Sequence, residues 1–167
     1  MKKLSWLLLI MPMLAILFTS CPYSSDVPID EPSIKAERSM YGKWYKASEM
    51  ESEHPAYYEF LDLDKFRYKL VNYTYSTTDS AYTTENYTAH FSKIDNLTFI
   101  NLQKDGETTF LLYRLDMKGK DEFVLFEVTD NIDEKFTNSS ELKEFMRKNM
   151  NLSFFYSKDE VVYKKKN

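Results

Sequence analysis

From residue 42 onward, apolar and polar residues alternate in short runs, and turn-forming residues separate the runs. Alternation with a period of two places the apolar side chains on one face of a β-strand, so the pattern predicts an all-β domain. The sequence predicts strands over residues 42–48, 56–62, 65–75, 81–92, 96–103, 107–118, 121–129 and 160–165.

The run over residues 65–75 changes phase in its middle. Phe66, Tyr68 and Leu70 share one face, whereas Val71 and the tyrosines that follow fall on the other. A β-bulge near Leu70–Val71 would reconcile the two halves by bending the strand, a device that barrels use to close. We therefore expect a bulge at this point.

One segment, residues 137–151, carries a helical pattern instead. Asn138 is a good N-cap residue, and Glu141 follows three positions later in the manner of a capping box. Leu142, Phe145 and Met146 then form an apolar stripe at helical spacing. The helix precedes the last strand, and we expect it to pack outside the sheet or across one end of it.

The first residues follow neither pattern. Lys2 and Lys3 precede an apolar stretch over residues 4–18, which leads through small residues to Cys21, the one cysteine of the chain. This arrangement resembles a bacterial lipoprotein signal, in which residues 1–20 are a signal peptide and Cys21 is acylated. The alternative is an ordinary secretory signal with a stray cysteine.

The segment after Cys21 is rich in proline and charge, without an apolar period. Residues 21–40 are therefore expected to form the acylated anchor and a flexible tether, with residues 41–167 as the folded domain. The expected partner is a membrane of the cell envelope, most simply the outer membrane, reached through the acyl chains. The periplasmic and surface faces both stay open.

Charge and composition exclude other classes of function. Without Lys2 and Lys3, 20 basic and 26 acidic side chains give a net charge of −6, which disfavours nucleic acid as a partner. His54 and His90 have no third ligand at a recognisable spacing, so no metal is expected. Motifs for nucleophilic catalysis, phosphate binding or dinucleotide binding are absent from the sequence. The chain is expected to be no enzyme and to need no cofactor.

Residues 72–90 are dominated by Tyr, Thr, Ser and Asn, and their middle forms the tip of an expected hairpin. Tyrosine-rich surfaces can bind sugars or proteins, because each ring offers an amphipathic face with little entropy to lose. The alternative is a solvent-exposed ribbon built from good strand formers.

The Gly42-x-Trp44-Tyr45 sequence at the start of the first strand resembles the motif that opens lipocalins and related calycins. The resemblance implies an eight-stranded antiparallel up-and-down barrel with Gly42 and Trp44 at its base. Thr129-Asp130-Asn131 partly matches the second motif of that family. The third motif is an arginine that covers the tryptophan, and Lys164 and Arg114 are the candidates for that role here.

Two functions follow from this interpretation. The first is a binding module for a small, largely apolar ligand inside the barrel. The candidate ligand-binding residues are Trp44, Phe60, Phe66, Tyr68, Phe99, Tyr113 and Phe126. The alternative is a barrel filled by its own side chains, whose Tyr/Thr-rich hairpin contacts an envelope protein or a glycan.

Overall fold

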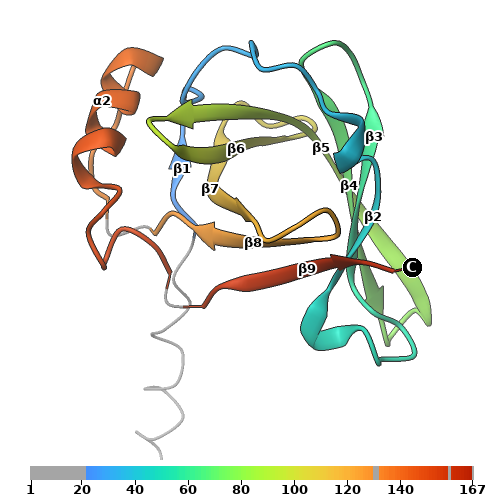
Figure 1. Cartoon of the computed structure of the whole chain (residues 1–167). Coiled ribbons are helices and arrows are strands. Elements are labelled where there is room, and N and C mark those ends of the chain that lie inside the picture. Colours follow the sequence, from blue (N-terminus) through green and yellow to red (C-terminus); the bar gives the residue numbers. More distant parts are fainter. Residues whose placement is uncertain (1–21, 130–131, 158, 167) are drawn as a thin grey trace, which may run out of the picture.

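The structure is a computed structural model that describes residues 22–129, 132–157 and 159–166 (Figure 1). The expected signal peptide, Cys21 and the residues Asp130 and Asn131 of the partial second motif lie outside the described residues.

Eight antiparallel strands, β2 to β9, form a closed up-and-down barrel (Figure 1). They are β2 (Gly42–Lys46), β3 (Tyr57–Asp62), β4 (Tyr68–Ser76), β5 (Ala81–Ile94), β6 (Leu97–Lys104), β7 (Phe110–Met117), β8 (Glu122–Glu127) and β9 (Val161–Lys165). Each strand pairs with the next, and β9 closes the barrel by pairing with both β8 and β2. The expected fold class is confirmed, and the strand ends shift by no more than three residues. Two short 3₁₀ helices, η2 (Arg38–Met40) and η3 (Ala47–Glu49), flank β2.

The expected bulge in β4 is wrong. The pairing of β4 with β3 and with β5 runs without interruption from Tyr68 to Tyr73 on one side and from Tyr68 to Ser76 on the other. Leu70 faces the lumen with Phe60, its partner on β3, whereas Tyr73 lies on the outer face beside Tyr57. The large apolar residues therefore do move from the inner to the outer face along β4, but they do so on a regular strand, at the place where the outer face becomes aromatic.

The helix α2 (Ser139–Asn149) packs against the outside of the barrel, as expected (Figure 1). The side chain of Asn138 accepts a hydrogen bond from the backbone N–H of Glu141 at 2.9 Å, which confirms the predicted N-cap. Leu142 and Met146 are buried against an outer-face cluster that includes Phe99. This second core explains why β7 and β8 are apolar on both faces.

The segment after Cys21 is not a free tether over the residues that the structure describes. Ser24 and Ser25 form a short strand, β1 (Ser24–Ser25), which pairs with β7 at the part of its edge that β8 does not reach. Tyr23 and Ile29 are buried in the outer-face cluster. We call residues 22–30 the strap. Its few apolar residues occupy a sheet edge and an apolar surface, and the sequence pattern gives no sign of either.

Residues 31–41 continue from the strap across one end of the barrel. Ile34, Ala36 and Met40 pack against the side chains of the lumen, and the backbone N–H of Ala36 donates to the carbonyl oxygen of Lys65 at 2.9 Å. This closed end lies opposite the end at which β8 finishes, where the carbonyl oxygen of Val128 accepts a hydrogen bond from Tyr23 of the strap. Within the described ranges, no helix is both long and apolar enough to cross a membrane.

Candidate functional site

Trp44 lies at the base of the lumen, next to the closed end. It is fully buried, its Nε1–H donates to the carbonyl oxygen of Met40 at 2.7 Å, and its ring centroid lies 4.7 Å from that of Phe123. Lys165 places its Nζ 4.8 Å from the centroid of the Trp44 ring and donates to the carbonyl oxygen of Ser39 at 2.6 Å. Trp44 therefore joins residues 31–41, which cross the closed end, to the barrel.

The cation over Trp44 is neither of the two expected candidates. Trp44 pairs with Lys165 across β2 and β9, so both side chains point inward. Lys164 points outward and forms an ion pair with Glu122 at 2.8 Å. Arg114 lies on the outer face of β7, over the ring of Phe126. Lys165 lies two residues after Tyr163, which also points into the lumen, so alternation along β9 is the signal that places Lys165 on the inner face.

Side chains of the protein fill the lumen beyond Trp44. Edge-to-face and tilted contacts link Phe60 to Tyr68 at 5.6 Å, Tyr68 to Phe91 at 5.3 Å, and Phe60 to Phe123 at 6.4 Å between centroids. These rings and the aliphatic residues around them are almost completely buried. The remaining buried members of this lumen cluster are Met40, Leu70, Tyr87, Ala89, Ile100, Leu102, Leu115 and Leu125.

The seven candidate ligand-binding residues do not converge on one site. Trp44, Phe60, Tyr68 and Tyr113 belong to the lumen cluster. Phe99 and Phe126 lie on the outer face, the first in the cluster under α2 and the second beneath Arg114. Phe66 is half-buried in the loop between β3 and β4. Because both faces of β6 to β8 are covered, alternation alone could not assign Phe99 and Phe126 to a side.

A group of tyrosines shares the lumen with Trp44, and Tyr58 is the cross-strand partner of Trp44 on β3. Tyr58 and Tyr163 lie 5.1 Å apart between ring centroids, and Tyr113 and Tyr87 belong to the same cluster. Burial raises the pKa of all four phenols above the usual value, so they stay neutral at physiological pH. Beside them, the pKa of Glu85 is lowered by its ion pair with Lys104.

A groove of about 450 Å³ lies at the closed end of the barrel. Its apolar part comes from Ile34, Met40, Phe91, Leu115 and Met117. Charged side chains share the lining, so the groove is a mixed surface depression rather than an apolar chamber. The charged lining residues are Glu37, Lys93, Asp116 and Lys118.

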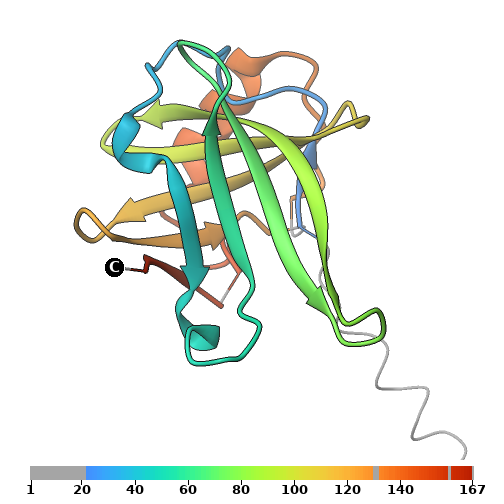
Figure 2. The same cartoon turned by 90° about the vertical axis from the view of Figure 1, so that its right-hand side faces the viewer.

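Six rings gather on the outer surface of β2 to β5, the side that Figure 2 presents to the viewer. We call this group the aromatic face. Its members are Tyr45, His54, Tyr57, Tyr73, Tyr75 and Tyr82. Tyr57 and Tyr73 stack with centroids 4.4 Å apart and planes 12° apart, and His54 stacks on Tyr75 at 3.7 Å.

Strand register creates the aromatic face. Tyr45 pairs with Tyr57, and Tyr57 with Tyr73, so three neighbouring strands place a tyrosine on the same row. Tyr75 and Tyr82 form the next row on β4 and β5. Directly opposed cross-strand side chains lie about 5 Å apart, which is close enough for their rings to touch. The rings therefore order one another without any ligand.

Polar groups surround these rings. Tyr73 donates from its hydroxyl to Glu59 at 3.2 Å, and burial together with this carboxylate raises the pKa of Tyr73. Lys43 lies 5.0 Å from the centroid of Tyr57, and Lys166 lies 5.9 Å from that of Tyr45. Among the described residues neither lysine has an ion-pair partner. The face thus combines ring surfaces and phenol hydroxyls with two ammonium groups that lie beside the rings.

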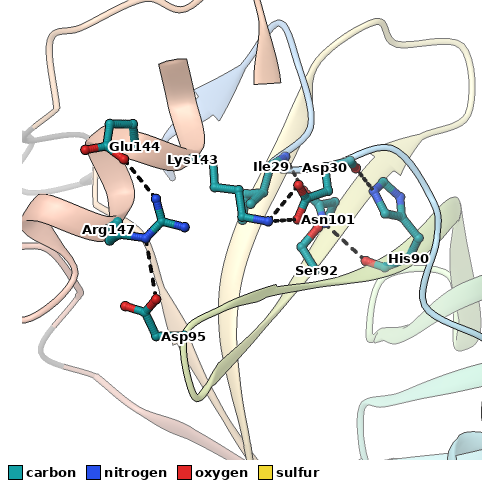
Figure 3. Close-up of polar contacts among 9 residues, drawn as sticks. All are labelled: Ile29, Asp30, His90, Ser92, Asp95, Asn101, Lys143, Glu144 and Arg147. Atoms are coloured by element: carbon teal, nitrogen blue, oxygen red, sulfur yellow. Dashed lines mark hydrogen bonds and ion pairs between the residues drawn. The ribbon is translucent and has the colours of Figure 1, made fainter. Parts of the chain in front are cut away.

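The two histidines play separate structural parts. His54 belongs to the aromatic face, whereas His90 lies beneath the strap, where its Nε2–H donates to the carbonyl oxygen of Asp30 at 2.8 Å (Figure 3). Burial lowers the pKa of His90. The described part of the chain contains no group of three or more His, Cys, Asp or Glu residues that could hold a metal ion.

Asn101 and Lys143 complete the attachment of the strap (Figure 3). The Oδ1 of Asn101 accepts from the backbone N–H of Ile29 at 2.8 Å, while its Nδ2 donates to Ser92 Oγ at 2.9 Å. Lys143 on α2 donates to both carboxylate oxygens of Asp30, at 2.6 and 2.8 Å. Asn101 and Ser92 are buried, Asp30 and Lys143 are partly buried, and each has a hydrogen-bond partner within the protein, so together they form a structural joint.

No family model, curated protein or solved structure matches this chain. The barrel is consistent with a lipocalin-like fold in its strand number and order.

Proposed function

We propose that this protein is a non-enzymatic lipoprotein of the cell envelope, anchored through acylated Cys21, which binds a carbohydrate chain on its aromatic face. The observation that carries the proposal is the set of six mutually ordered rings on the outer surface of β2 to β5. Large side chains gathered on an exposed surface mark interaction sites more often than scattered ones do.

The chemistry of the aromatic face suits a sugar. The C–H groups on the flat side of a sugar ring stack favourably on an electron-rich aromatic face. Tyr73 and Tyr82 keep neutral hydroxyls, because burial raises the pKa of each, and neutral phenols both donate and accept hydrogen bonds. Lys43 and Lys166 add donors beside the rings. Since the rings already hold one another, little entropy is lost when a ligand stacks on them.

Binding of purified protein to cell-envelope polysaccharides, measured by titration calorimetry, tests this proposal. Tyr57 is the central ring, in contact with Tyr45, Tyr73 and Tyr82. Replacing Tyr57 by Ala is expected to weaken binding about tenfold or more, because hot-spot aromatics contribute at least that much. Tyr57→Phe keeps the ring and separates stacking from hydrogen bonding.

Phe66→Ala is the matched control, since Phe66 is a half-buried ring in the β3–β4 loop at the closed end. It is expected to bind as the wild type does. Equal affinities for the wild type and Tyr57→Ala would contradict the proposal. A ligand that proves to be a protein, captured by the same face, would contradict the carbohydrate assignment.

A second candidate function is the capture of a small, largely apolar ligand. The groove beside Met40 favours it, because about 450 Å³ of partly apolar space lies next to the lumen there. Displacement of a fluorescent fatty acid should then be lost in Met117→Arg, which places a charge in the groove lining at an exposed position, while Tyr57→Ala should keep it. Absence of any displacement in the wild type would rule out this candidate.

A further inference from the structure

The turn that follows α2 exposes two large apolar side chains. Phe154 is 59% exposed and Leu152 is 39% exposed, and Phe154 is the most exposed large apolar residue in the described ranges. The neighbouring Phe155 is 1% exposed. Adjacent phenylalanines thus point in opposite directions, one into the outer-face cluster and the other into solvent.

Backbone hydrogen bonds hold this turn in one conformation. The backbone N–H of Leu152 donates to the carbonyl oxygen of Asn149 at 2.9 Å, and that of Phe155 donates to the carbonyl oxygen of Leu152 at 3.1 Å. Phe155 also accepts a backbone hydrogen bond from Thr129 at 3.2 Å. These bonds fix the backbone on both sides of Phe154, so its ring is held away from the core.

The same turn lies beside the start of the described chain (Figure 1). Thr129 forms a β-bridge with Pro22, and its hydroxyl donates to the carbonyl oxygen of Phe154 at 2.9 Å. The next residue of the strap, Tyr23, donates from its backbone N–H to the carbonyl oxygen of Val128 at 3.1 Å. One residue therefore joins the first position of the strap to the exposed phenylalanine.

Cys21 is the residue directly before Pro22 in the sequence, so a lipid group on Cys21 is linked through one peptide bond to the first position of the strap. The strap itself is fixed to the barrel, because it is paired with β7 and buried at Tyr23 and Ile29. Acyl chains on Cys21 would hold the bilayer at this edge of the domain.

We propose that Leu152 and Phe154 enter the bilayer surface next to the acyl chains, so that the domain sits directly on the membrane at this edge. The inference rests on the proposed acylation of Cys21. Transfer of these two exposed apolar side chains from water into lipid is favourable once the anchor brings the bilayer close to them. The aromatic face lies on β2 to β5, across the barrel from α2 and the strap, where a partner can still reach it (Figure 1).

The test uses full-length protein that is acylated in cells and reconstituted into phosphatidylethanolamine–phosphatidylglycerol vesicles. Single cysteines for an environment-sensitive fluorophore are introduced by Phe154→Cys and Leu152→Cys. Leu63→Cys and Met117→Cys are matched controls, because both residues are exposed and apolar but lie at the closed end. Acylation blocks Cys21, so each variant carries one reactive thiol.

Quenchers attached to lipid acyl chains should quench the fluorophores at positions 152 and 154 strongly and those at 63 and 117 little. Equal quenching at all four positions, or none at 154 in vesicle-bound protein, would overturn the inference while leaving the anchor intact. Protein that carries no acyl mass and stays in the aqueous phase would overturn the anchor itself, and the inference with it.

Hydrogen exchange provides a check without a label. In the acylated double variant Leu152→Ser/Phe154→Ser, the backbone amides of residues 150–156 should exchange equally fast with and without vesicles. In the wild type, vesicles should slow that exchange several-fold. Wild-type exchange that vesicles leave unchanged would overturn the contact.

Discussion

Asn101 is the side chain that best tests how the strap is held. It is fully buried on the outer face of β6 and takes part in three hydrogen bonds: from Ile29 N–H at 2.8 Å, to Ser92 Oγ at 2.9 Å and to the carbonyl oxygen of His90 at 3.3 Å. Replacing it by Leu keeps a similar side-chain volume but removes all three hydrogen bonds. The buried N–H of Ile29 is then left without an acceptor.

The size of the effect follows from these contacts. A buried polar group that loses its partner destabilises a protein by about 1–3 kcal/mol. Ile29 N–H bears that penalty in full, whereas Ser92 and the carbonyl group of His90 lose weaker bonds. We expect Asn101→Leu to lower the free energy of unfolding by about 2–4 kcal/mol, and the melting temperature by about 5–12 °C.

Urea unfolding followed by the fluorescence of the buried Trp44 measures this change. Hydrogen exchange should show residues 22–30 exchanging faster in the variant, while β2 to β4 keep their protection. Gln103→Leu is the control, because Gln103 lies on the same face of β6 but is only partly buried and bonds Thr108 at 3.4 Å. A loss below about 0.5 kcal/mol for Asn101→Leu, or unchanged exchange in the strap, would refute the reasoning.

Three further predictions concern the core and its charges. Burial lowers the pKa of His90, so the unfolded chain binds its proton first; stability should be complete above about pH 6.5 and fall as pH drops toward the folded-state pKa, and His90→Gln should flatten that part of the pH–stability curve. Lys165→Met should lower the free energy of unfolding in urea by about 1–2 kcal/mol, because it removes the bond to Ser39 and the cation over Trp44. The outward-facing Lys164 is its control and should change stability by less than about 1 kcal/mol when replaced by Met. Leu142→Ala should cost about 2–4 kcal/mol in the same assay, since this side chain is fully buried under α2, and a change below 1 kcal/mol would mean that α2 packs loosely.

Charged neighbours do not obscure the prediction for His90. Asp30 and Glu31 lie near the ring and favour its protonated form, while Arg67 opposes it, and burial outweighs them. The carboxylates whose pKa is lowered, such as Glu49 and Glu85, lose their stabilising contacts only at more acidic pH. The two phases of acid destabilisation should therefore be separable.

The sequence was sufficient for the barrel because alternation is a local property. The strands and the N-cap at Asn138 follow from a period of two and from hydrogen-bonding chemistry within a few residues. Trp44 at the base of the lumen follows from its place at the start of β2. The strap could not be predicted, since Tyr23 and Ile29 have no period and their hydrogen-bond partners lie 111 and 72 residues away.

Sidedness was the other limit. Phe99 and Phe126 are apolar residues on strands with two covered faces, so alternation alone could not place them outside the lumen. The aromatic face was visible only as a tyrosine-rich hairpin. Its stacking depends on the register that brings Tyr45, Tyr57 and Tyr73 into one row, and register is set by three strands together.

The central claim is that ligands meet the outside of this barrel rather than its lumen, and fluorine NMR of protein containing 3-fluorotyrosine tests it most directly. Single Tyr→Phe variants assign each resonance, and the polysaccharide that binds in calorimetry is then titrated. We expect shifts for Tyr57, Tyr73 and Tyr82 and none for Tyr58, Tyr113 and Tyr163, which line the lumen. Shifts confined to the three lumen tyrosines would contradict the claim.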